Sequence, residues 1–121
     1  MEPDSKSVFV IDDEELVANS IALILRSNGY QALALYDPES ALAKLETTKP
    51  AVVISDVEMP GMNGVQLAVL IRERYPDCRV LLFSGHAETV DLLDDARRKG
   101  YVFEVLQKPI PPAELLAKIA A

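Results

Sequence analysis

The chain has 121 residues, of which 50% are hydrophobic and 26% charged, and this predicts a folded domain rather than a disordered tail. The formal net charge of -7 argues against binding to nucleic acid or to an anionic membrane, because both attract a basic face. The single cysteine, Cys78, and the single histidine, His86, exclude an internal disulfide and a zinc site built from several such side chains.

The same composition bears on location. The apolar runs are short compared with the about 20 residues that a membrane-spanning helix needs. Residues 1–5 are acidic, whereas a secretory signal begins with basic residues. We therefore expect a cytoplasmic protein that makes no membrane contact and forms one domain over residues 1–121.

The first half of the chain predicts two strand–helix units. Residues 8–11 are continuously apolar, as in a strand buried on both faces. A helix is expected from about 14 to 28, since its apolar residues form one stripe and Gly29 stands where a C-terminal cap belongs. Residues 31–35 predict the second strand, and the Asp-Pro pair at 37–38 predicts the start of the second helix.

The second half continues the alternation. The remaining strands are expected at residues 51–55, 80–83 and 102–106. The remaining helices are expected after a loop rich in proline and glycine up to about Tyr75, from about 87 to 99, and from the proline pair 111–112 onward. In the helix at 87–99, the spacing predicts that Asp94 pairs with Arg98 and Asp95 with Lys99. Five strands that alternate with five helices indicate a parallel sheet covered on both faces.

Polar residues stand at the ends of four of the predicted strands. They are Asp12, Asp13, Asp56, Ser84 and Lys108. Ligands of an open parallel sheet bind beyond the carboxyl ends of its strands, so these side chains converge if the strands are neighbours. Three clustered carboxylates raise one another's pKa, and a hard divalent cation such as Mg²⁺ relieves their repulsion. With a hydroxyl and a lysine added, the set suits phosphoryl transfer onto or off a carboxylate.

Each of these residues also has a purely structural interpretation. The pair Asp12–Asp13 can cap a helix, Asp56 and Ser84 can be turn residues, and Lys108 can be a solvated lysine. The functional interpretation rests on their occurrence together at successive strand ends of one short chain. His86 is expected in a loop without a catalytic role, and Cys78 is expected as a small residue near a strand start.

Four segments together resemble the receiver domain of two-component response regulators, and the match covers essentially the whole chain. They are Val-Phe-Val-Ile-Asp-Asp-Glu at 8–14, Asp-Val-Glu-Met-Pro-Gly-Met-Asn-Gly at 56–64, Ser-Gly at 84–85 and Lys-Pro at 108–109. The resemblance implies a flavodoxin-like α/β fold, which is a doubly wound parallel sheet of five strands in the order 2-1-3-4-5 with five helices.

The resemblance also implies a role for each site residue. Asp56 would accept a phosphoryl group, Ser84 would donate a hydrogen bond to that group, and Lys108 would pair with it. The implied cofactor is Mg²⁺, held by Asp13, by Asp56, by Asp12 through a metal-bound water, and by the backbone carbonyl of Glu58. The peptide bond between Lys108 and Pro109 would be cis.

The chain departs from the family pattern near its fifth predicted strand. Receiver domains usually carry Tyr or Phe three residues before the lysine, and this ring moves inward when the Ser or Thr moves. Here that position is Val105, and the segment 100–108 is one residue longer than usual. Tyr101 and Phe103 are near, but strand alternation does not let either replace the missing ring.

The sequence therefore predicts a phospho-accepting switch that has no separate substrate to turn over, and so is not an enzyme in the usual sense. Its phosphodonor would be a histidine kinase or a phosphotransfer protein, and its output a downstream protein. One alternative is a pseudo-receiver, which binds partners without being phosphorylated. A phosphatase of the haloacid dehalogenase type is a further alternative. Such enzymes need a nucleophile and a second acid two residues apart after the first strand, and here Glu14 follows Asp12 at that spacing. They also need a cap domain, for which this chain has no segment.

Overall fold

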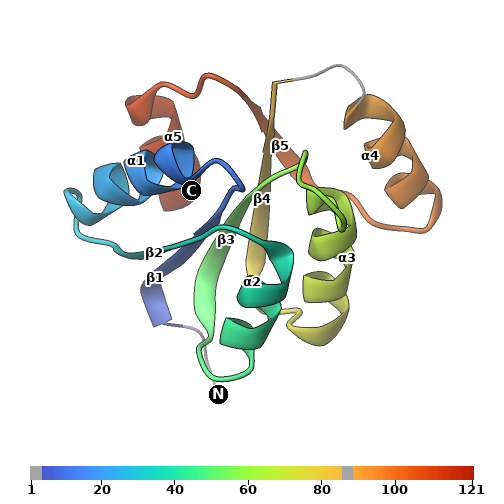
Figure 1. Ribbon diagram of the computed structural model, residues 1–121, viewed down its shortest axis with the longest axis horizontal. Coiled ribbons are helices and arrows are strands. Elements are labelled where there is room, and N and C mark those ends of the chain that lie inside the picture. The colour runs from blue at the N-terminus through green and yellow to red at the C-terminus, as the bar shows by residue number, and fades with distance from the viewer. Residues whose placement is uncertain (1–3, 86–88) are drawn as a thin grey trace.

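The chain folds into one parallel sheet with helices on both faces (Figure 1). The computed structural model describes residues 4–85 and 89–121. The strands are β1 (Asp4–Ile11), β2 (Gln31–Leu35), β3 (Pro50–Asp56), β4 (Arg79–Ser84) and β5 (Glu104–Gln107). The helices are α1 (Glu15–Arg26), α2 (Pro38–Leu45), α3 (Gly64–Arg74), α4 (Thr89–Arg98) and α5 (Pro112–Ala120). The strand order β2-β1-β3-β4-β5 confirms the expected doubly wound topology.

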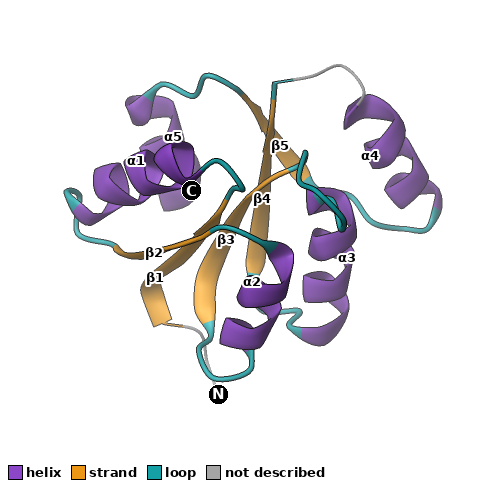
Figure 2. Ribbon diagram, viewed as in Figure 1, coloured by secondary structure: helices purple, strands orange, loops and turns teal. Residues whose placement is uncertain are grey.

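The sheet separates two hydrophobic cores. Along β1, Phe9 and Ile11 point into the core shared with α2, α3 and α4, whereas Val8 and Val10 point into the core shared with α1 and α5. Figure 2 shows the same division, with α1 and α5 on one side of the strands and the other three helices on the opposite side. Because both faces are covered, the central strands contain continuous apolar runs at residues 8–11, 51–54 and 80–83, as the sequence predicted.

Local sequence determines several of the boundaries. The Asp37 side chain accepts a hydrogen bond of 2.7 Å from the backbone N–H of Ser40 and caps α2, which confirms the expected helix start. Gly29 and Gly100 have φ values of 90° and 93°, a left-handed backbone that stops α1 and α4. Cys78 is buried just before β4, and burial raises the pKa of its thiol to about 11.

The structure corrects two expectations near β5. The strand begins at Glu104 rather than at residue 102, because its pairing with β4 begins where Glu104 lies beside Leu81. Arg79 of β4 also holds Glu104 through an ion pair of 3.0 Å. In α4, Asp94 pairs with Arg97 at 3.5 Å and Asp95 pairs with Arg98 at 2.8 Å, which is a spacing of three residues rather than four. His86 and the expected first residues of this helix lie outside the described residues.

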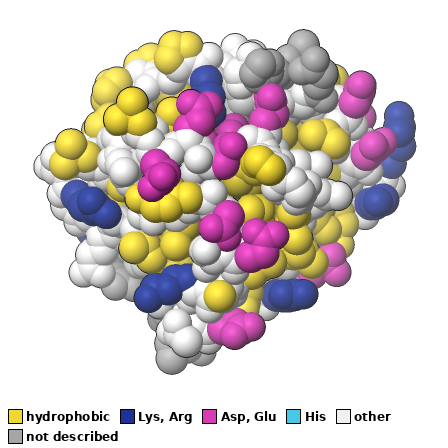
Figure 3. Space-filling model, in the orientation of Figure 1, with side chains coloured by type: hydrophobic (Ala, Val, Ile, Leu, Met, Phe, Trp, Pro, Cys, Tyr) yellow, Lys and Arg dark blue, Asp and Glu magenta, His cyan; other side chains and the backbone are white. Residues whose placement is uncertain are grey.

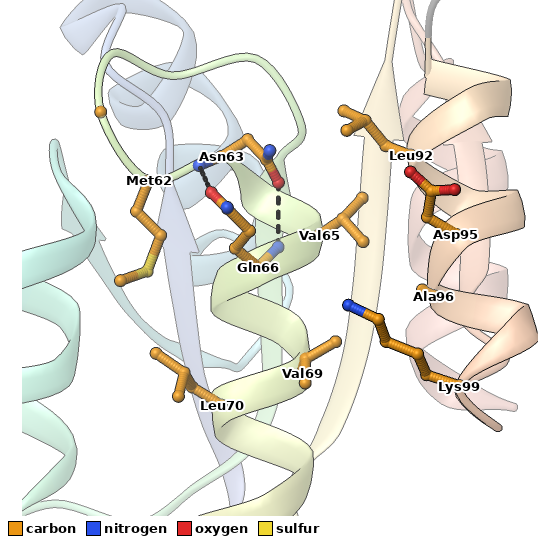
Figure 4. Close-up of a pocket in the computed structure, with 11 residues that line it drawn as sticks. Met62, Asn63, Val65, Gln66, Val69, Leu70, Leu92, Asp95, Ala96 and Lys99 are labelled. Carbon is orange, nitrogen blue, oxygen red and sulfur yellow. Dashed lines mark hydrogen bonds between the residues drawn. The ribbon is translucent and has the colours of Figure 1, made fainter.

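Helix α4 stands apart from its neighbour α3. A groove of about 670 Å³ separates the two helices, and its walls include Val65, Leu70, Leu92 and Lys99. Figure 4 shows Leu92 and Lys99 reaching from α4 toward α3, with Val65 on the opposite wall. We call this the α3–α4 groove. Leu70 of α3 is only partly buried because it faces this groove.

Candidate functional site

The residues singled out at the strand ends meet at the carboxyl edge of the sheet. Parallel pairing sets Ile11 beside Ser55 and Asp56 beside Phe83, so the ends of β1, β3 and β4 lie level. The backbone N–H of Lys108 donates to the carbonyl of Ser84 at 3.0 Å, which places the lysine directly after β5 on the same edge. In the space-filling view, acidic side chains with a basic one among them lie near this upper rim (Figure 3).

Lys108 joins two of the carboxylates. Its Nζ lies 3.2 Å from Oδ2 of Asp12 and 3.2 Å from Oδ1 of Asp56. The side chains of Asp12 and Asp56 are 0% and 6% exposed, and that of Lys108 is 25% exposed. The ammonium group also lies 4.8 Å from the centre of the Phe83 ring. Lys108 is therefore an ordered part of the site rather than a solvated surface lysine.

The carboxylates form a set of oxygen ligands. Oxygen atoms of Asp12, Asp13 and Asp56 all lie within 4.8 Å of one another. Asp12 and Asp56 are buried and Asp13 is exposed, so the cluster opens to solvent on one side. Asp12 does not act as the N-cap residue of α1, which is Glu14, although it accepts a hydrogen bond of 2.9 Å from the Glu14 N–H. Closely spaced carboxylates open to water could hold a hard divalent cation.

Burial and mutual repulsion alter the ionisation of these groups. Burial, followed by the charge of Asp12, raises the pKa of Asp56 to about 6. Burial also raises the pKa of Asp12, against the lowering effect of its hydrogen bond with Glu14 and of the charge of Lys108. For Lys108, burial lowers the pKa, but the charges of Asp56 and Asp12 outweigh it and the net pKa is raised. Lys108 therefore stays positively charged beside the two acids at neutral pH.

Ser84 ends β4 as a buried residue rather than as part of a solvated turn. Its side chain is hydrogen-bonded to the hydroxyl of Thr89, in the first described turn of α4, and both residues are buried. Thr89 was not among the predicted site residues. No spacing rule points to it, because the contact joins the last residue of β4 to the first residue of α4.

Gly64 ends the motif at 56–64 but was not among the predicted site residues. A Cβ at this position would overlap the carbonyl oxygen of Asp56 and would lie 2.8 Å from the Cα of Val57. Its N–H donates to the Val57 carbonyl at 2.8 Å, which closes the loop that follows Asp56. Asn63 and Gln66 then form a capping box that starts α3, with bonds of 2.9 and 3.0 Å (Figure 4). Gly64 thus lets α3 begin against the backbone of Asp56.

Position 105 has no aromatic ring, and the two nearby rings lie elsewhere. Val105 is 36% exposed and lines a cavity of about 410 Å³ together with Ser84 and Thr89. The rings of Tyr101 and Phe103 are stacked with centroids 6.3 Å apart, and Arg72 of α3 lies 4.8 Å from the Phe103 ring. Neither ring lines the cavity beside Ser84. The peptide bond between Lys108 and Pro109 is cis, as expected.

Comparison with known proteins agrees with this geometry. The family model of the response regulator receiver domain matches residues 8–120. The response regulator protein FleR of Pseudomonas aeruginosa is 36% identical over 93% of this chain, which covers 24% of FleR. The transcriptional regulatory protein FixJ of Azorhizobium caulinodans is 34% identical over 98% of this chain, which covers 56% of FixJ. The chain therefore spans about half of such relatives or less.

Solved structures support the same assignment. The chemotaxis response regulator CheY4 of Vibrio cholerae superposes with a TM-score of 0.81 at 25% identity, and the match covers 99% of this chain and 98% of that one. A receiver domain protein from Clostridium thermocellum superposes with a TM-score of 0.83 at 28% identity, covering 94% and 90% of the two chains. Within residues 4–85 and 89–121, no helix is long and apolar enough to cross a membrane. The fold, the acidic pocket and the family match agree, and the chain belongs to the receiver domain family of two-component response regulators.

Proposed function

We propose that this protein is a phosphorylation switch in which Asp56 accepts a phosphoryl group from a phosphohistidine. The donor would be a histidine kinase or a phosphotransfer protein, and the output would be a change of shape read by a downstream protein. The observation that carries the proposal is the bridging of Asp12 and Asp56 by Lys108, at 3.2 Å from each carboxylate. We propose further that residues 1–121 act as one receiver domain in the cytoplasm, as response regulators typically do.

The residues of the site divide the chemistry among them. An oxygen of Asp56 forms the new bond to phosphorus while the bond from phosphorus to the imidazole nitrogen breaks, and the imidazole leaves. A pKa of about 6 keeps Asp56 mainly ionised, and therefore nucleophilic, at neutral pH. Lys108 lies where it can exchange its contact with Asp56 for one with a phosphoryl oxygen, and Ser84 would donate a hydrogen bond to another.

The acidic cluster would hold the cofactor. The ligands we propose for Mg²⁺ are the carboxylates of Asp13 and Asp56, the backbone carbonyl of Glu58, and Asp12 through a metal-bound water. A bound Mg²⁺ supplies positive charge that neutralises the carboxylates and the oxygens of the transferred group. An all-oxygen ligand set beside a solvent-open edge suits an ion that keeps several of its waters.

A pseudo-receiver is less well supported than a phosphorylated switch. A module that only binds partners has no need for three clustered carboxylates with a lysine held between two of them. Burying the charges of Asp12 and Asp56 lowers the stability of the fold unless a ligand compensates for it. We also do not favour catalysis on a separate substrate, since the chain modifies its own Asp56 in the proposed reaction.

Intact-mass spectrometry after incubation with acetyl phosphate and Mg²⁺ tests the proposal. We expect the wild type to gain one phosphoryl group, and we expect neither Asp56→Asn nor a sample in EDTA to gain it. Asp77→Asn is the matched control, because Asp77 is an exposed acid between α3 and β4, away from the site, and should label normally. Equal labelling of Asp56→Asn would overturn the assignment of Asp56, and an unlabelled wild type would favour the pseudo-receiver.

A further inference from the structure

A pair of buried hydroxyls links the proposed phosphorylation site to helix α4. The Oγ atom of Ser84 and the Oγ1 atom of Thr89 share a hydrogen bond, and these residues are 6% and 5% exposed. Ser84 ends β4, one strand away from Asp56, whereas Thr89 stands in the first described turn of α4. The two hydroxyls therefore join the edge of the sheet directly to a helix.

The chemistry of a hydroxyl makes this contact sensitive to phosphorylation. A serine hydroxyl has one proton to donate and two lone pairs that accept. Once Ser84 donates its proton to a phosphoryl oxygen, Thr89 can remain bonded to Ser84 only as the donor. The hydrogen bond between the two hydroxyls must then run in one direction, from Thr89 to Ser84. If Ser84 moves toward Asp56, the Thr89 hydroxyl must move with it to keep this bond. Leaving a buried hydroxyl without a partner is unfavourable, so α4 is expected to follow the movement of Ser84.

Helix α4 has few fully buried side chains that would resist such a movement, and its Leu92 and Leu93 are only partly buried against the core. Thr89 and Ala96 are its buried residues, and Val90 is 57% exposed. On one side the helix faces the α3–α4 groove, and on the other it faces the cavity of about 410 Å³ beside Val105. Thr89 itself lines that cavity, which leaves room for its side chain to shift. A helix held by so few packed side chains responds to the loss or gain of one buried contact.

We propose that Thr89 is the positioning residue that transmits the state of Asp56 to α4 through Ser84, in the place of the aromatic ring that position 105 lacks. The inference rests on the proposed function, since it needs a phosphoryl group on Asp56. It requires only that the phosphoryl group favour one of two arrangements of the hydroxyl pair. By linkage, a partner that binds α4 in the favoured arrangement would also favour phosphorylation.

The test compares two substitutions of Thr89 in the full chain. Thr89→Val keeps the side-chain shape and removes the hydroxyl, whereas Thr89→Ser keeps the hydroxyl. Phosphorylation is measured by intact mass, and the response of α4 by the NMR shifts of amides 92–98 on adding beryllofluoride and Mg²⁺. We expect all three proteins to label to the same extent. We expect wild type and Thr89→Ser to show the α4 shifts, and Thr89→Val to lose at least about half of their size. The amides of Tyr101 and Phe103 are the internal reference and should move little.

Each outcome bears on one of the two proposals. A wild type that neither labels nor responds would overturn the proposed function. Normal labelling with undiminished α4 shifts in Thr89→Val would overturn the role of Thr89 and leave the proposed function standing. If Thr89→Val does not fold, Thr89→Ala replaces it, and undiminished shifts there overturn the role equally. The role of Thr89 would also be overturned if Thr89→Ser lost as much of the α4 shifts as Thr89→Val. Thr89→Ser keeps the hydroxyl, so that result would mean that packing of the side chain, and not its hydrogen bond, controls α4.

Discussion

Helices α3 and α4 flank the end of β4 and are neighbours across a groove, yet they are attached to the site in opposite ways. Helix α3 begins with a capping box and presses Gly64 against the backbone of Asp56, and five of its residues are buried. Helix α4 buries two residues and reaches the site through the hydroxyl of Thr89. The contrast suggests a division of labour in which α3 fixes the phosphoacceptor and α4 is free to respond to it.

The largest effect should come from breaking the attachment of α3. Gly64→Ala places a methyl group against the carbonyl oxygen of Asp56. This oxygen belongs to the backbone, so it cannot move aside as the end of a flexible side chain could. We expect a loss of about 3 kcal/mol in the free energy of unfolding, measured by urea denaturation, together with slower labelling of Asp56. Gly85→Ala is the matched control, because its Cβ would lie 3.7 Å from that of Lys108 in ordinary contact. Equal stability of Gly64→Ala and Gly85→Ala would show that α3 is not fixed in this way.

A smaller effect should appear in the pH dependence of stability without metal. Folding raises the pKa of Asp56 from 3.8 to about 6, which favours its protonated form. Its stabilising contribution is therefore present below pH 3.8 and is lost as the pH rises through about 6. In EDTA, Asp56→Asn should match wild type near pH 4 and exceed it by about 2 kcal/mol at pH 7, measured by urea denaturation. A gap that stays constant from pH 4 to 7 would contradict this, and added Mg²⁺ should narrow the gap.

Substitution of Lys108 tests the part of the site around the phosphoacceptor Asp56, which α3 holds in place. Lys108→Ala removes the cation that neutralises Asp12 and Asp56, so a Mg²⁺ ion competes with less positive charge. We expect Mg²⁺ affinity at pH 8 to be retained and to tighten by about two- to fivefold, or roughly 1 kcal/mol at most, by calorimetric titration. The same variant should respond less to phosphorylation, because the phosphoryl group loses its partner. A collapse of Mg²⁺ affinity would instead assign Lys108 to holding the metal site together.

The smallest effect concerns the position that lacks the ring. Val105 is 36% exposed beside an open cavity, so a larger side chain there meets little resistance. Val105→Tyr should change the free energy of unfolding by less than about 0.5 kcal/mol. Its ring should stay accessible to a fluorescence quencher in the resting protein. Destabilisation by about 1–3 kcal/mol would mean that this region is packed more tightly than α4's few buried residues indicate.

Much of this arrangement could be predicted from the sequence. The second strand at 31–35 and the Asp37 cap follow from local residues and were confirmed, and so was the sheet order implied by the resemblance. The acids and the lysine were predicted to converge because parallel strands end at one edge, and Asp12, Asp56 and Lys108 do meet there.

The missed features depend on contacts between distant segments. Glu104 is a charged residue within the strand expected at 102–106, and its partner Arg79 comes from the neighbouring strand, 25 positions earlier in the chain. Strand β1 begins at Asp4, earlier than its apolar run, because pairing with Pro50 extends it through polar residues. Thr89 carries no local pattern that marks it, and Gly64 belongs to the motif at 56–64 without a predicted role in the site. The contribution of each residue depends on a contact with an atom of another element.

The separation of the two cores by the sheet has a consequence for how the protein tolerates change. Phe9 and Val10 are adjacent in the chain, yet one packs with α2, α3 and α4 and the other with α1 and α5. Residues that share no packing partners have nearly additive effects on stability. Compensating substitutions for a damaged Phe9 should therefore arise in α2, α3 or α4, and those for Val10 in α1 or α5. Two nearly independent halves can diverge separately, so the helices of one face can be fitted to new partners while the other face keeps the domain folded.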